Sequence, residues 1–579
     1  MEAASQHGDP SLHEARLIVD CAWEELQRSP YVQARLGVAQ TRLPDVSFAE
    51  AERRSNAGNL ILKRLQALDL GTLPHELALT LRLVVFQARA WSRAAQWYWI
   101  AIDPLGIGEF GLFLPTAYCG GYLLSYVHKQ LASFAFSELR DADRYLALVV
   151  DYACLIDQFT ARTTGQAERG IRIPRVQAMQ ARSLLTALKS GVRAQLAAAP
   201  QHAAAWPQDF AGQVENCIAT CVEPAFDRAL AGLSDAYFEQ APEMVGIGQY
   251  AGGEAVYAEL VKLHTTLDLT PEQVQVRGLE RMSEIEESIS AIQAELGFKG
   301  DSKAFVACLN NDPQWRANTV EGVKAVFQRY IDRLRPHLKE YFSIAPKAAY
   351  GVAPLPEALQ EAMTYGYYDP PRSDRAEGLY LFNASHLTKQ SLFHLGALTY
   401  HELMPGHHLQ LATQQENPDL HPFRAHSFVT AYIEGWAEYA ATLAGEMGLY
   451  EMPQERYGRL VMDAFLTSRL VVDTGMNVLG WSLERAREYM RTHSRLTEAE
   501  ILTESVRYSC DIPAQALAYK VGDAQILAMR DRMRCALGER FNLKDFHDAI
   551  LRSGALPLAD LDWHVDRKIE QRVHGVQTL

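Results

Sequence analysis

The chain has 579 residues, and 48% of them are hydrophobic, which is enough apolar surface for a large buried core and excludes wholesale disorder. Its 70 acidic residues outnumber the 56 Lys and Arg residues and leave a net charge of −14, which excludes a general binder of nucleic acid or of an anionic membrane surface. Eight cysteines are too sparse for a disulfide framework and indicate buried free thiols in a reducing compartment.

The N-terminal part of the chain is expected to be helical. Its first twenty residues lack a basic start followed by an apolar stretch, so the sequence predicts no secretory signal and a cytoplasmic location. Apolar residues recur at helical spacing, for example at Ile61, Leu65 and Leu68. The uncharged segment 110–127 contains a proline and several glycines, and we interpret it as a buried turn and helix rather than as a membrane span.

A stretch rich in glycine and proline at 240–254 is the best candidate for a boundary between two parts of the chain. We therefore predict an N-terminal helical lobe over residues 1–250 and a catalytic lobe over residues 251–579. The second lobe departs from helical spacing at 378–383, which follows a turn with two prolines and predicts a short strand in a small sheet or hairpin. The predicted fold class is mainly α and two-lobed.

The residues that carry chemistry are concentrated in the segment 400–410, which reads Tyr-His-Glu-Leu-Met-Pro-Gly-His-His-Leu-Gln. Histidine is the commonest protein ligand of zinc, and a Glu beside a ligand His can accept a proton from the attacking water. The common zinc hydrolase motif is His-Glu-x-x-His, and Pro405 stands where its second His would be. We predict His401 as a metal ligand and Glu402 as the general base.

Two residues compete for the position of second ligand, His407 and His408. On a regular helix, His407 would lie about 240° around the axis from His401 and could not share its face. Pro405 removes a helical donor and Gly406 tolerates a distorted backbone, so a bulge in the helix is expected to bring His407 beside His401. His408 shares the face of a regular helix but lies about 10 Å along its axis, which is awkward for one ion. We favour His407 and assign His408 to a supporting or substrate-side position.

A catalytic zinc site needs a third protein ligand. The downstream helical segment 432–439 carries Glu434 and, one turn later, Glu438. The intervening loop at 416–426 allows this helix to return past the motif. We predict Glu434 as the third ligand and Glu438 as the group that orients a ligand His. The expected cofactor is one Zn²⁺ per chain, with manganese or cobalt as alternatives, because affinity order alone does not set the metal.

The chain resembles the bacterial domain-of-unknown-function 885 (DUF885) family in two motifs, His401-Glu402-x-x-Pro405-Gly406-His407-His408-x-Gln410 and Glu434-Gly435-Trp436-Ala437. The likeness runs along nearly the whole chain. Members of that family resemble zinc carboxypeptidases of the Taq type, which implies a helical, saddle-shaped molecule with the metal in a deep central cleft. Related gluzincins close their motif with a Gly-His pair, which implies that His407 is the equivalent ligand. The family usually has a His where this chain has Asn477, and that departure implies altered substrate binding.

Further side chains are predicted to act on the substrate. The donor that stabilises the oxyanion is Tyr519 as first choice and Tyr508 as second. Arg507 is a candidate for pairing with a substrate carboxylate. The strand at 378–383 is expected to bind an extended peptide along its edge, with Tyr380 and Asn383 facing that peptide.

Three functions are compatible with these residues. The first is a zinc-dependent hydrolase that cleaves the amide bonds of short peptides, because a deep cleft would exclude folded proteins. The second is a zinc hydrolase or tailoring enzyme that acts on a small peptide-like metabolite, which Asn477 favours. The third is a metal-free binding scaffold, which would require the His401, Glu402, His407 and Glu434 set to be vestigial. We predict neither a nucleic acid nor a membrane as partner.

Overall fold

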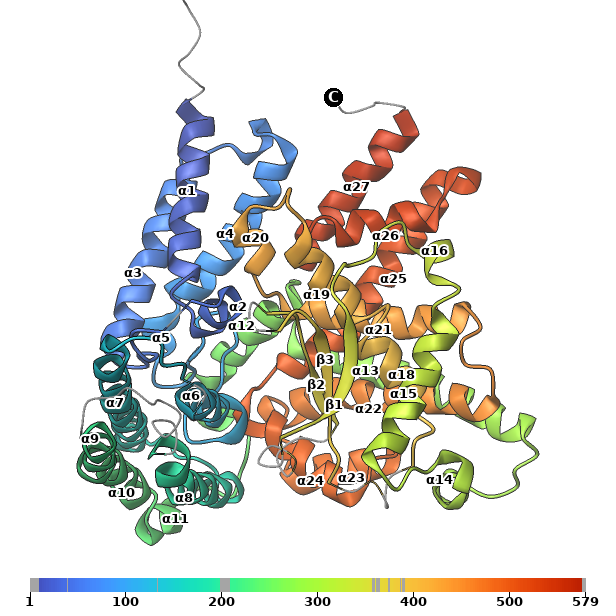
Figure 1. Cartoon of the computed structure of the whole chain (residues 1–579). Coiled ribbons are helices and arrows are strands. Elements are labelled where there is room, and N and C mark those ends of the chain that lie inside the picture. The colour runs from blue at the N-terminus through green and yellow to red at the C-terminus, as the bar shows by residue number, and fades with distance from the viewer. Residues whose placement is uncertain are drawn as a thin grey trace, which may run out of the picture.

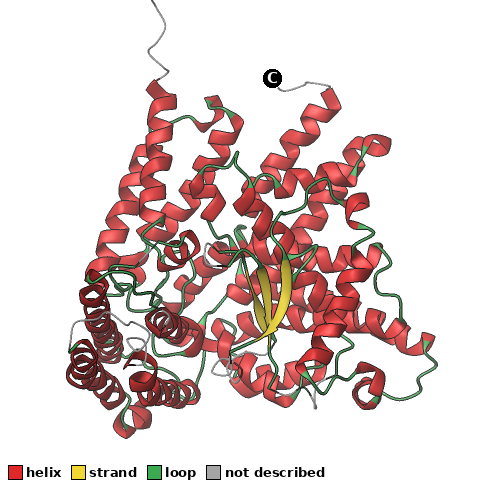
Figure 2. Ribbon diagram, in the orientation of Figure 1, coloured by secondary structure: helices red, strands yellow, loops and turns green. Residues whose placement is uncertain are grey.

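The computed structural model describes residues 10–574 except 39, 133, 198–208, 357–359, 361–364, 373–374, 386 and 388–390. Helices make up most of the molecule, and one small β-sheet lies near the centre of the view, as predicted (Figures 1 and 2). None of the described helices combines the length and the apolar character that a membrane crossing needs. The segment 110–127 is a turn followed by a helix, as predicted.

The chain begins with a group of helices in the upper left of Figure 1, in which α1, α3 and α4 pack on one another. The predicted stripe in α3 is buried at Ile61 and Leu65. The elements of this group are α1 (Pro10–Leu26), α2 (Pro30–Leu36), α3 (Phe48–Leu65), η1 (Leu70–Thr72), α4 (His75–Ser92) and α5 (Ala94–Trp97).

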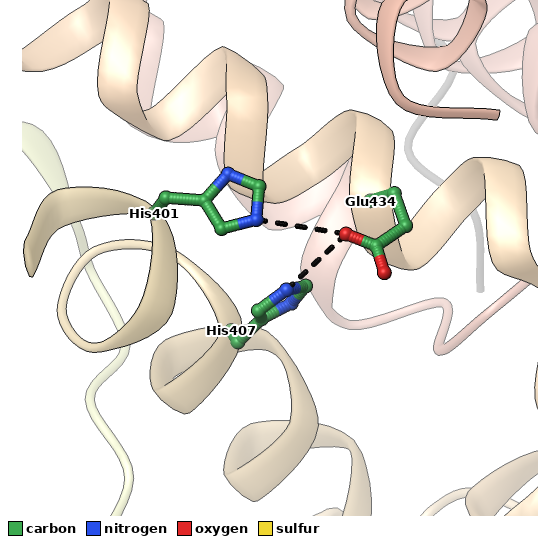
Figure 3. Close-up of side chains that lie close together, drawn as sticks. All are labelled: His401, His407 and Glu434. Atoms are coloured by element: carbon green, nitrogen blue, oxygen red, sulfur yellow. Dashed lines mark ion pairs between the residues drawn. The ribbon is translucent and has the colours of Figure 1, made fainter. Parts of the chain in front are cut away.

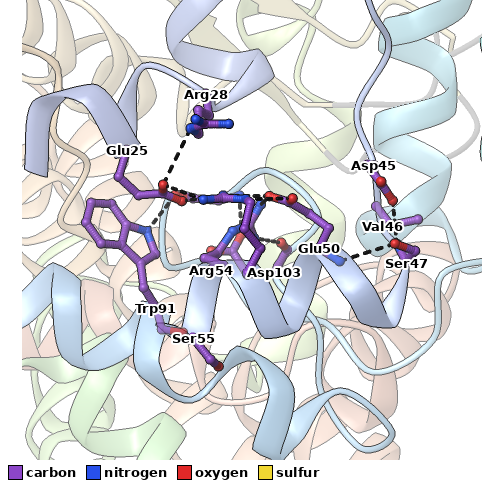
Figure 4. Close-up of polar contacts among 12 residues, drawn as sticks. Glu25, Arg28, Asp45, Val46, Ser47, Glu50, Arg54, Ser55, Trp91 and Asp103 are labelled. Atoms are coloured by element: carbon purple, nitrogen blue, oxygen red, sulfur yellow. Dashed lines mark hydrogen bonds and ion pairs between the residues drawn. The ribbon is translucent and has the colours of Figure 1, made fainter. Parts of the chain in front are cut away.

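Polar contacts from α3 and α4 hold the loop that follows α5 (Figure 4). Nη1 of Arg54 donates to the carbonyl oxygen of Asp103 at 2.9 Å, and Nε1 of Trp91 donates to the carbonyl oxygen of Gly106 at 3.3 Å. The carboxylate of Asp103 accepts from the backbone N–H groups of Gly106 and Gly108, both at 2.7 Å. The loop 103–108 therefore has a defined shape without regular secondary structure.

A second group of helices forms the lower left of Figure 1, around the long helix α7. Its elements are the π-helix η2 (Ala117–Gly121), α6 (Tyr122–Ala132), α7 (Arg140–Glu168), α8 (Arg175–Ala197), α9 (Phe210–Cys217), the π-helix η4 (Ile218–Val222), α10 (Glu223–Gly232), α11 (Asp235–Gln240) and η5 (Ile247–Gln249). The helices that follow are α12 (Gly253–Thr265), α13 (Pro271–Glu295), α14 (Ser302–Asn311), η6 (Pro313–Trp315), α15 (Val320–Leu334) and α16 (Leu338–Tyr341).

The sheet has three strands, β1 (Tyr350–Pro354), β2 (Gly366–Asp369) and β3 (Gly378–Phe382), in the order β1-β3-β2. The register pairs β1 with β3 in parallel and β2 with β3 in antiparallel orientation. The strand predicted at 378–383 is β3, and it is the central strand. Both of its edges are therefore occupied, which contradicts the prediction that a peptide binds along it. Strand β2 forms an outer edge of the sheet.

The remaining elements are helices that surround the sheet and carry the predicted site. They are α18 (Leu395–Glu402), α19 (His407–Glu416), α20 (Pro422–His426), α21 (Thr430–Glu446), α22 (Pro453–Asn477), α23 (Leu483–His493), α24 (Glu498–Val506), η7 (Arg507–Asp511), η8 (Gln515–Leu517), α25 (Ala518–Leu537), η9 (Gly538–Arg540), α26 (Leu543–Leu551) and α27 (Leu558–His574). Helices α21 and α25 approach so closely that a Cβ on Gly435 would lie 2.5 Å from backbone atoms of Gly522.

Two large hydrophobic clusters make up most of the core. One joins helices α6 to α12 with the C-terminal part of α22. The other joins α1 and α4 with α15, the sheet, α18 to α21 and α25 to α27. Both halves of the chain thus supply side chains to both clusters, and the division after residue 250 stays a prediction.

Candidate metal centre

The predicted motif folds into two helices joined by a turn, and not into one bulged helix. Helix α18 ends at Glu402, and the next helix, α19, begins at His407. Pro405 has no N–H to continue the first helix. Gly406 lies so close to the end of α18 that a Cβ there would come within 1.8 Å of the carbonyl oxygen of His401. From α21, Nε1 of Trp436 donates to the carbonyl oxygen of Pro405 at 3.0 Å and holds the turn in place.

The turn brings His401 and His407 together, and α21 places Glu434 against both (Figure 3). Nε2 of His401 lies 3.6 Å from Oε2 of Glu434, and Nε2 of His407 lies 3.3 Å from the same oxygen. The two imidazole rings are nearly perpendicular, at 84°. One donor atom from each of the three residues lies within 4.8 Å of the others.

These three residues fit a small divalent ion. Ligand atoms that bind zinc at about 2.0–2.1 Å in a tetrahedral site are separated by roughly 3.3 Å, which is close to the distances observed here. Oε2 of Glu434 is buried and has no hydrogen-bond partner in the described part of the chain, as expected for an oxygen reserved for a cation. Two imidazoles and one carboxylate are also a common ligand set of catalytic zinc.

A buried network of charged side chains contacts His401 through Nδ1. Nδ1 of His401 lies 2.9 Å from Oε1 of Glu438, which leaves Nε2 to face Glu434. Oε2 of Glu438 accepts from Nη2 of Arg459 at 3.0 Å and lies 3.6 Å from Nζ of Lys520. Lys520 also pairs with Asp463 at 2.9 Å. Burial opposes the charge of Glu438, but Arg459, His401 and Lys520 outweigh it and lower its pKa to about 2.

The same carboxylates act on His401 when no ion is present. Burial lowers the pKa of His401, but the nearby carboxylates of Glu434 and Glu438 outweigh it and raise that pKa to about 10. Metal binding requires a neutral imidazole, so an ion that enters the site displaces a proton.

Glu402 is the residue after His401 and faces the same cavity. It is buried, and burial raises its pKa, although His401 and His407 act in the opposite direction. The backbone N–H of Tyr368 in β2 points toward the Glu402 carboxylate and also acts to lower this pKa. A carboxylate with a raised pKa beside the ligand set has the properties of a general base that works near neutral pH.

The cavity in front of these residues has a volume of about 210 Å³. Tyr519 and Arg507, both predicted, line it together with Arg469, which the sequence analysis missed. The guanidinium carbon of Arg469 lies 4.7 Å from the centre of the Tyr519 ring, and Arg507 also carries its charge close to the Tyr519 hydroxyl. Burial, together with the charge of Glu434, raises the pKa of Tyr519 to about 12, so its phenol stays protonated at neutral pH.

The two arginines keep some of their hydrogen-bonding capacity unused. Nη1 of Arg469 and Nε of Arg507 are buried and have no partner among the described residues. The carboxylate of Glu504 lies 3.2 Å from Nη2 of Arg469 and 4.0 Å from Nη1 of Arg507. One carboxylate therefore faces two guanidinium groups, and this end of the cavity carries excess positive charge.

Two predicted substrate-side residues lie elsewhere. His408 is fully buried beneath the sheet, where Nδ1 bonds the hydroxyl of Tyr368 at 2.7 Å and Nε2 bonds the carbonyl oxygen of Ala348 at 3.1 Å. Asn477 accepts from the backbone N–H of Ile247 at 3.0 Å and donates to the carbonyl oxygen of Tyr508 at 3.0 Å. Neither residue lines the cavity, because each has its polar atoms engaged within the fold.

Three more predictions are corrected in the same way. Tyr508 is buried behind Arg469, whose Nε donates to its hydroxyl at 2.7 Å, and it also bonds Glu504. Tyr380 lies in the central strand and is fully buried. Asn383 donates from Nδ2 to the carbonyl oxygen of Gln360 at 2.8 Å. None of the three lines the cavity.

The sequence did not single out Arg459, Arg469 and Lys520, although each shows a feature that could have indicated a buried ion pair. Arg469 interrupts a long apolar run in α22, where an unpaired charge would be costly. Arg459 and Lys520 are likewise charged residues on largely buried helices. A cation in such a context indicates a buried acidic partner, but the sequence does not show which one.

Comparisons with known proteins agree with the fold and leave the chemistry open. The family model described as "Bacterial protein of unknown function (DUF885)" matches residues 30–565. The chain belongs to the DUF885 family. A comparison with curated proteins gives no match. Two solved structures, both described as putative lipoproteins, share the fold of this DUF885 protein. The protein from Colwellia psychrerythraea has 23% identity and a TM-score of 0.88, and the one from Shewanella oneidensis has 17% identity and a TM-score of 0.73. Each likeness covers 97% of this chain and 99% of the other.

Proposed function

We propose that this DUF885 protein is a metal-dependent hydrolase that cleaves an amide bond in a short peptide or peptide-like molecule. One observation carries the proposal: His401, His407 and Glu434 bring three ligand atoms to within 4.8 Å of one another at the wall of a cavity that Glu402 and Tyr519 also line. Ligands, base and a phenolic donor are the parts that such a reaction needs.

Each protein group has a defined task in this proposal. A divalent ion, for which zinc is the best fit, would activate a water molecule and polarise the amide carbonyl when bound by His401, His407 and Glu434. Glu402 accepts the proton of the attacking water and passes it to the departing amine. Tyr519 stays protonated and donates a hydrogen bond to the carbonyl oxygen as negative charge develops on it.

Arg469 and Arg507 favour a substrate with a carboxylate near the scissile bond. Their unpartnered N–H groups are buried at the cavity wall, where a carboxylate would satisfy them. With a divalent ion bound, the ion and the two arginines carry more positive charge than Glu402, Glu434 and Glu504 carry negative charge. An anionic group is therefore attracted to this end of the site.

The edge of β2 supports an extended substrate backbone. The N–H of Tyr368 points to Glu402, so the outer edge of β2 faces the general base. Groups two residues apart in a strand point the same way, so the backbone of Gly366 faces outward as well and lines the cavity. We infer that the substrate main chain pairs with Gly366, which moves the predicted peptide-binding edge from β3 to β2.

The size of the cavity limits the substrate. A volume of about 210 Å³ is below the usual range for small-molecule sites, so the cavity admits a short peptide segment but not a folded chain. A peptide-like metabolite with a free carboxylate meets the same requirements. A panel from dipeptides to decapeptides, together with acylated amino acids, separates these two substrate classes.

Metal analysis of single variants tests the proposal. Protein purified without chelator is measured for zinc, manganese and cobalt by mass spectrometry, and the same samples are assayed on the peptide panel. The wild type is expected to hold about one zinc per chain, as one complete ligand set provides. His407→Ala is expected to lose the metal and the hydrolysis.

His408→Ala is the matched control, because it removes the neighbouring imidazole. It is expected to keep the metal while its melting temperature falls, because the buried partners Tyr368 and Ala348 lose a hydrogen bond at a cost of about 1–3 kcal/mol. A wild type that holds no metal even after zinc is added back would refute the proposed function.

A further inference from the structure

A second cavity adjoins the cavity in front of His401, His407 and Glu434, which is called the metal cavity below. The two cavities share Tyr31, Tyr367 and Pro370 as lining residues, so they meet at one wall. The second cavity, called the outer chamber below, has a volume of about 130 Å³. None of the residues predicted from the sequence to act in catalysis or binding lines it.

Strand β2 shows the direction from one cavity to the other. At its inner end, the ring of Tyr365 packs against Phe465 at 5.8 Å, and both residues line the metal cavity with Arg469. At its outer end, Asp369 lines only the outer chamber, whereas Pro370 lines both cavities. An extended chain rises about 3.3 Å per residue, so roughly 17 Å separates Tyr365 from Pro370.

The helix η2–α6 forms a second wall in the same direction. Tyr118 lines the metal cavity, and its ring lies 4.9 Å from the guanidinium carbon of Arg507. Tyr122 and Tyr126 follow at intervals of four residues and line the outer chamber. Side chains spaced by four share a helix face and advance about 6 Å per step. A row of tyrosines thus leads from the arginines to the outer chamber.

The N-terminal helices complete the chamber. Helix α2 contributes Tyr31, Ala34 and Arg35, and Tyr126 donates to the carbonyl oxygen of Pro30 at 3.4 Å, which links α6 to α2. Leu105 projects from the loop 103–108 that the contacts of Figure 4 hold in place. The chamber therefore lies between helices of the predicted N-terminal lobe and strand β2 of the predicted catalytic lobe.

The side chains of the chamber favour a planar apolar group without positive charge. Four tyrosines line it, and Tyr122 leaves 41% of its surface exposed although it stands in a concavity. Two arginines and one aspartate are also present, and that aspartate is already paired with Arg372 and Arg375. Tyrosine faces stack well on aromatic rings, and the excess positive charge disfavours cations.

We propose that the outer chamber is a substrate subsite that binds an aromatic group at the end of the substrate remote from the carboxylate held by Arg469 and Arg507. This inference rests on the proposed function, because it assumes a substrate that spans the metal site. In this proposal, the row of tyrosines and α2 determine which substrates bind. The N-terminal helices therefore take part in substrate recognition.

Equilibrium binding of two hydroxamates tests the proposal without relying on turnover. Both carry the same dipeptide backbone and the same metal-chelating hydroxamate, and they differ only in a phenylacetyl or an acetyl group at the amino end. Dissociation constants are measured by calorimetry with zinc-loaded protein. The phenyl group is expected to tighten binding to the wild type about tenfold, as expected for a ring that stacks on tyrosine.

The ratio of the two dissociation constants is read within each variant, so that a change common to both ligands cancels. Ala34→Trp fills the chamber and Tyr122→Ala removes a stacking face, and each is expected to bring the ratio near one. Gln33→Trp, on the same helix but outside the chamber lining, is the matched control and is expected to keep the ratio.

The outcomes separate the two proposals. Equal binding of both hydroxamates to the wild type, or a phenyl preference that survives both Ala34→Trp and Tyr122→Ala, would overturn the outer subsite while leaving the metal site standing. Failure of both hydroxamates to bind zinc-treated wild type would overturn the proposed function and the outer subsite with it.

Discussion

The metal cavity and the outer chamber share strand β2 and two tyrosines, yet the side chains of the first are fixed by more contacts than those of the second. Behind the metal cavity, His401 is bonded to Glu438, which is bonded to Arg459 and paired with Lys520, all in the interior. In the outer chamber, Tyr122 keeps 41% of its surface exposed. A metal site requires ligand atoms fixed to within tenths of an ångström, whereas a ring can stack in several offsets. The proposed ligands therefore need fixed positions, whereas the side chains of the outer chamber do not.

The largest expected effect comes from the turn that joins α18 and α19, the two helices that carry the proposed histidine ligands. In Gly406→Ala, the new Cβ would lie 1.8 Å from the carbonyl oxygen of His401, so the backbone must shift and His407 moves with it. We expect metal binding to be lost and the free energy of unfolding to fall by about 3 kcal/mol or more. Zinc content and urea unfolding measure the two effects.

Gly232→Ala at the end of α10 is the control for that prediction, because a Cβ added at Gly232 would lie 4.0 Å from the nearest heavy atom. It is expected to change neither quantity appreciably. If Gly406→Ala keeps both metal and stability, the turn is more adaptable than the described contacts imply.

Matched removal of one hydroxyl from each cavity compares the two regions directly. Tyr519→Phe is expected to lower kcat about 100-fold to 1000-fold on the best peptide substrate with little change in zinc content, because it deletes the donor to the developing oxyanion. Tyr122→Phe keeps its ring and is expected to change kcat less than about twofold. Equal losses in the two variants would contradict the assignment of Tyr519.

The charge behind His401 is expected to act through metal affinity. In Glu438→Gln, the partner of His401 becomes neutral, and the dissociation constant for zinc is expected to rise about 10-fold to 100-fold. Competition with a chromogenic chelator measures it. Glu446→Gln, on the same helix but paired with Arg530, is the control and should leave zinc affinity unchanged. Unchanged affinity in Glu438→Gln would show that the network serves stability alone.

The residues of the proposed metal site were predictable because their relation is mostly local. His401, Glu402 and His407 lie within one short segment, and helical spacing with a ligand-type side chain was enough to select Glu434. The geometry between His401 and His407 was not predictable in detail. The expected bulge is a full break, because the backbone at Gly406 folds onto the end of α18 and Trp436 from another helix bonds the turn.

Other assignments failed for reasons that only packing reveals. His408 was assigned to a supporting or substrate-side position, but Tyr368 and Ala348 occupy both of its ring nitrogens beneath the cavity wall. Asn477 stands where a substrate group was expected, yet it bonds Ile247 in the loop before α12. The strand at 378–383 exists, but a second strand pairs on each side of it, which moves the free edge to β2.

The sequence alone determined the helical character of the chain, the short strand, the family likeness and the residues that form the predicted ligand set. These depend on periodicity and on residue types that are close together in the chain. The tertiary structure decided which faces meet. It placed Arg469 and Arg507 around Tyr519, backed His401 with charges from three helices, and built the outer chamber from α2, α6 and β2. Spacing along a chain fixes which side chains share a face, but only the packing of distant elements fixes what that face touches.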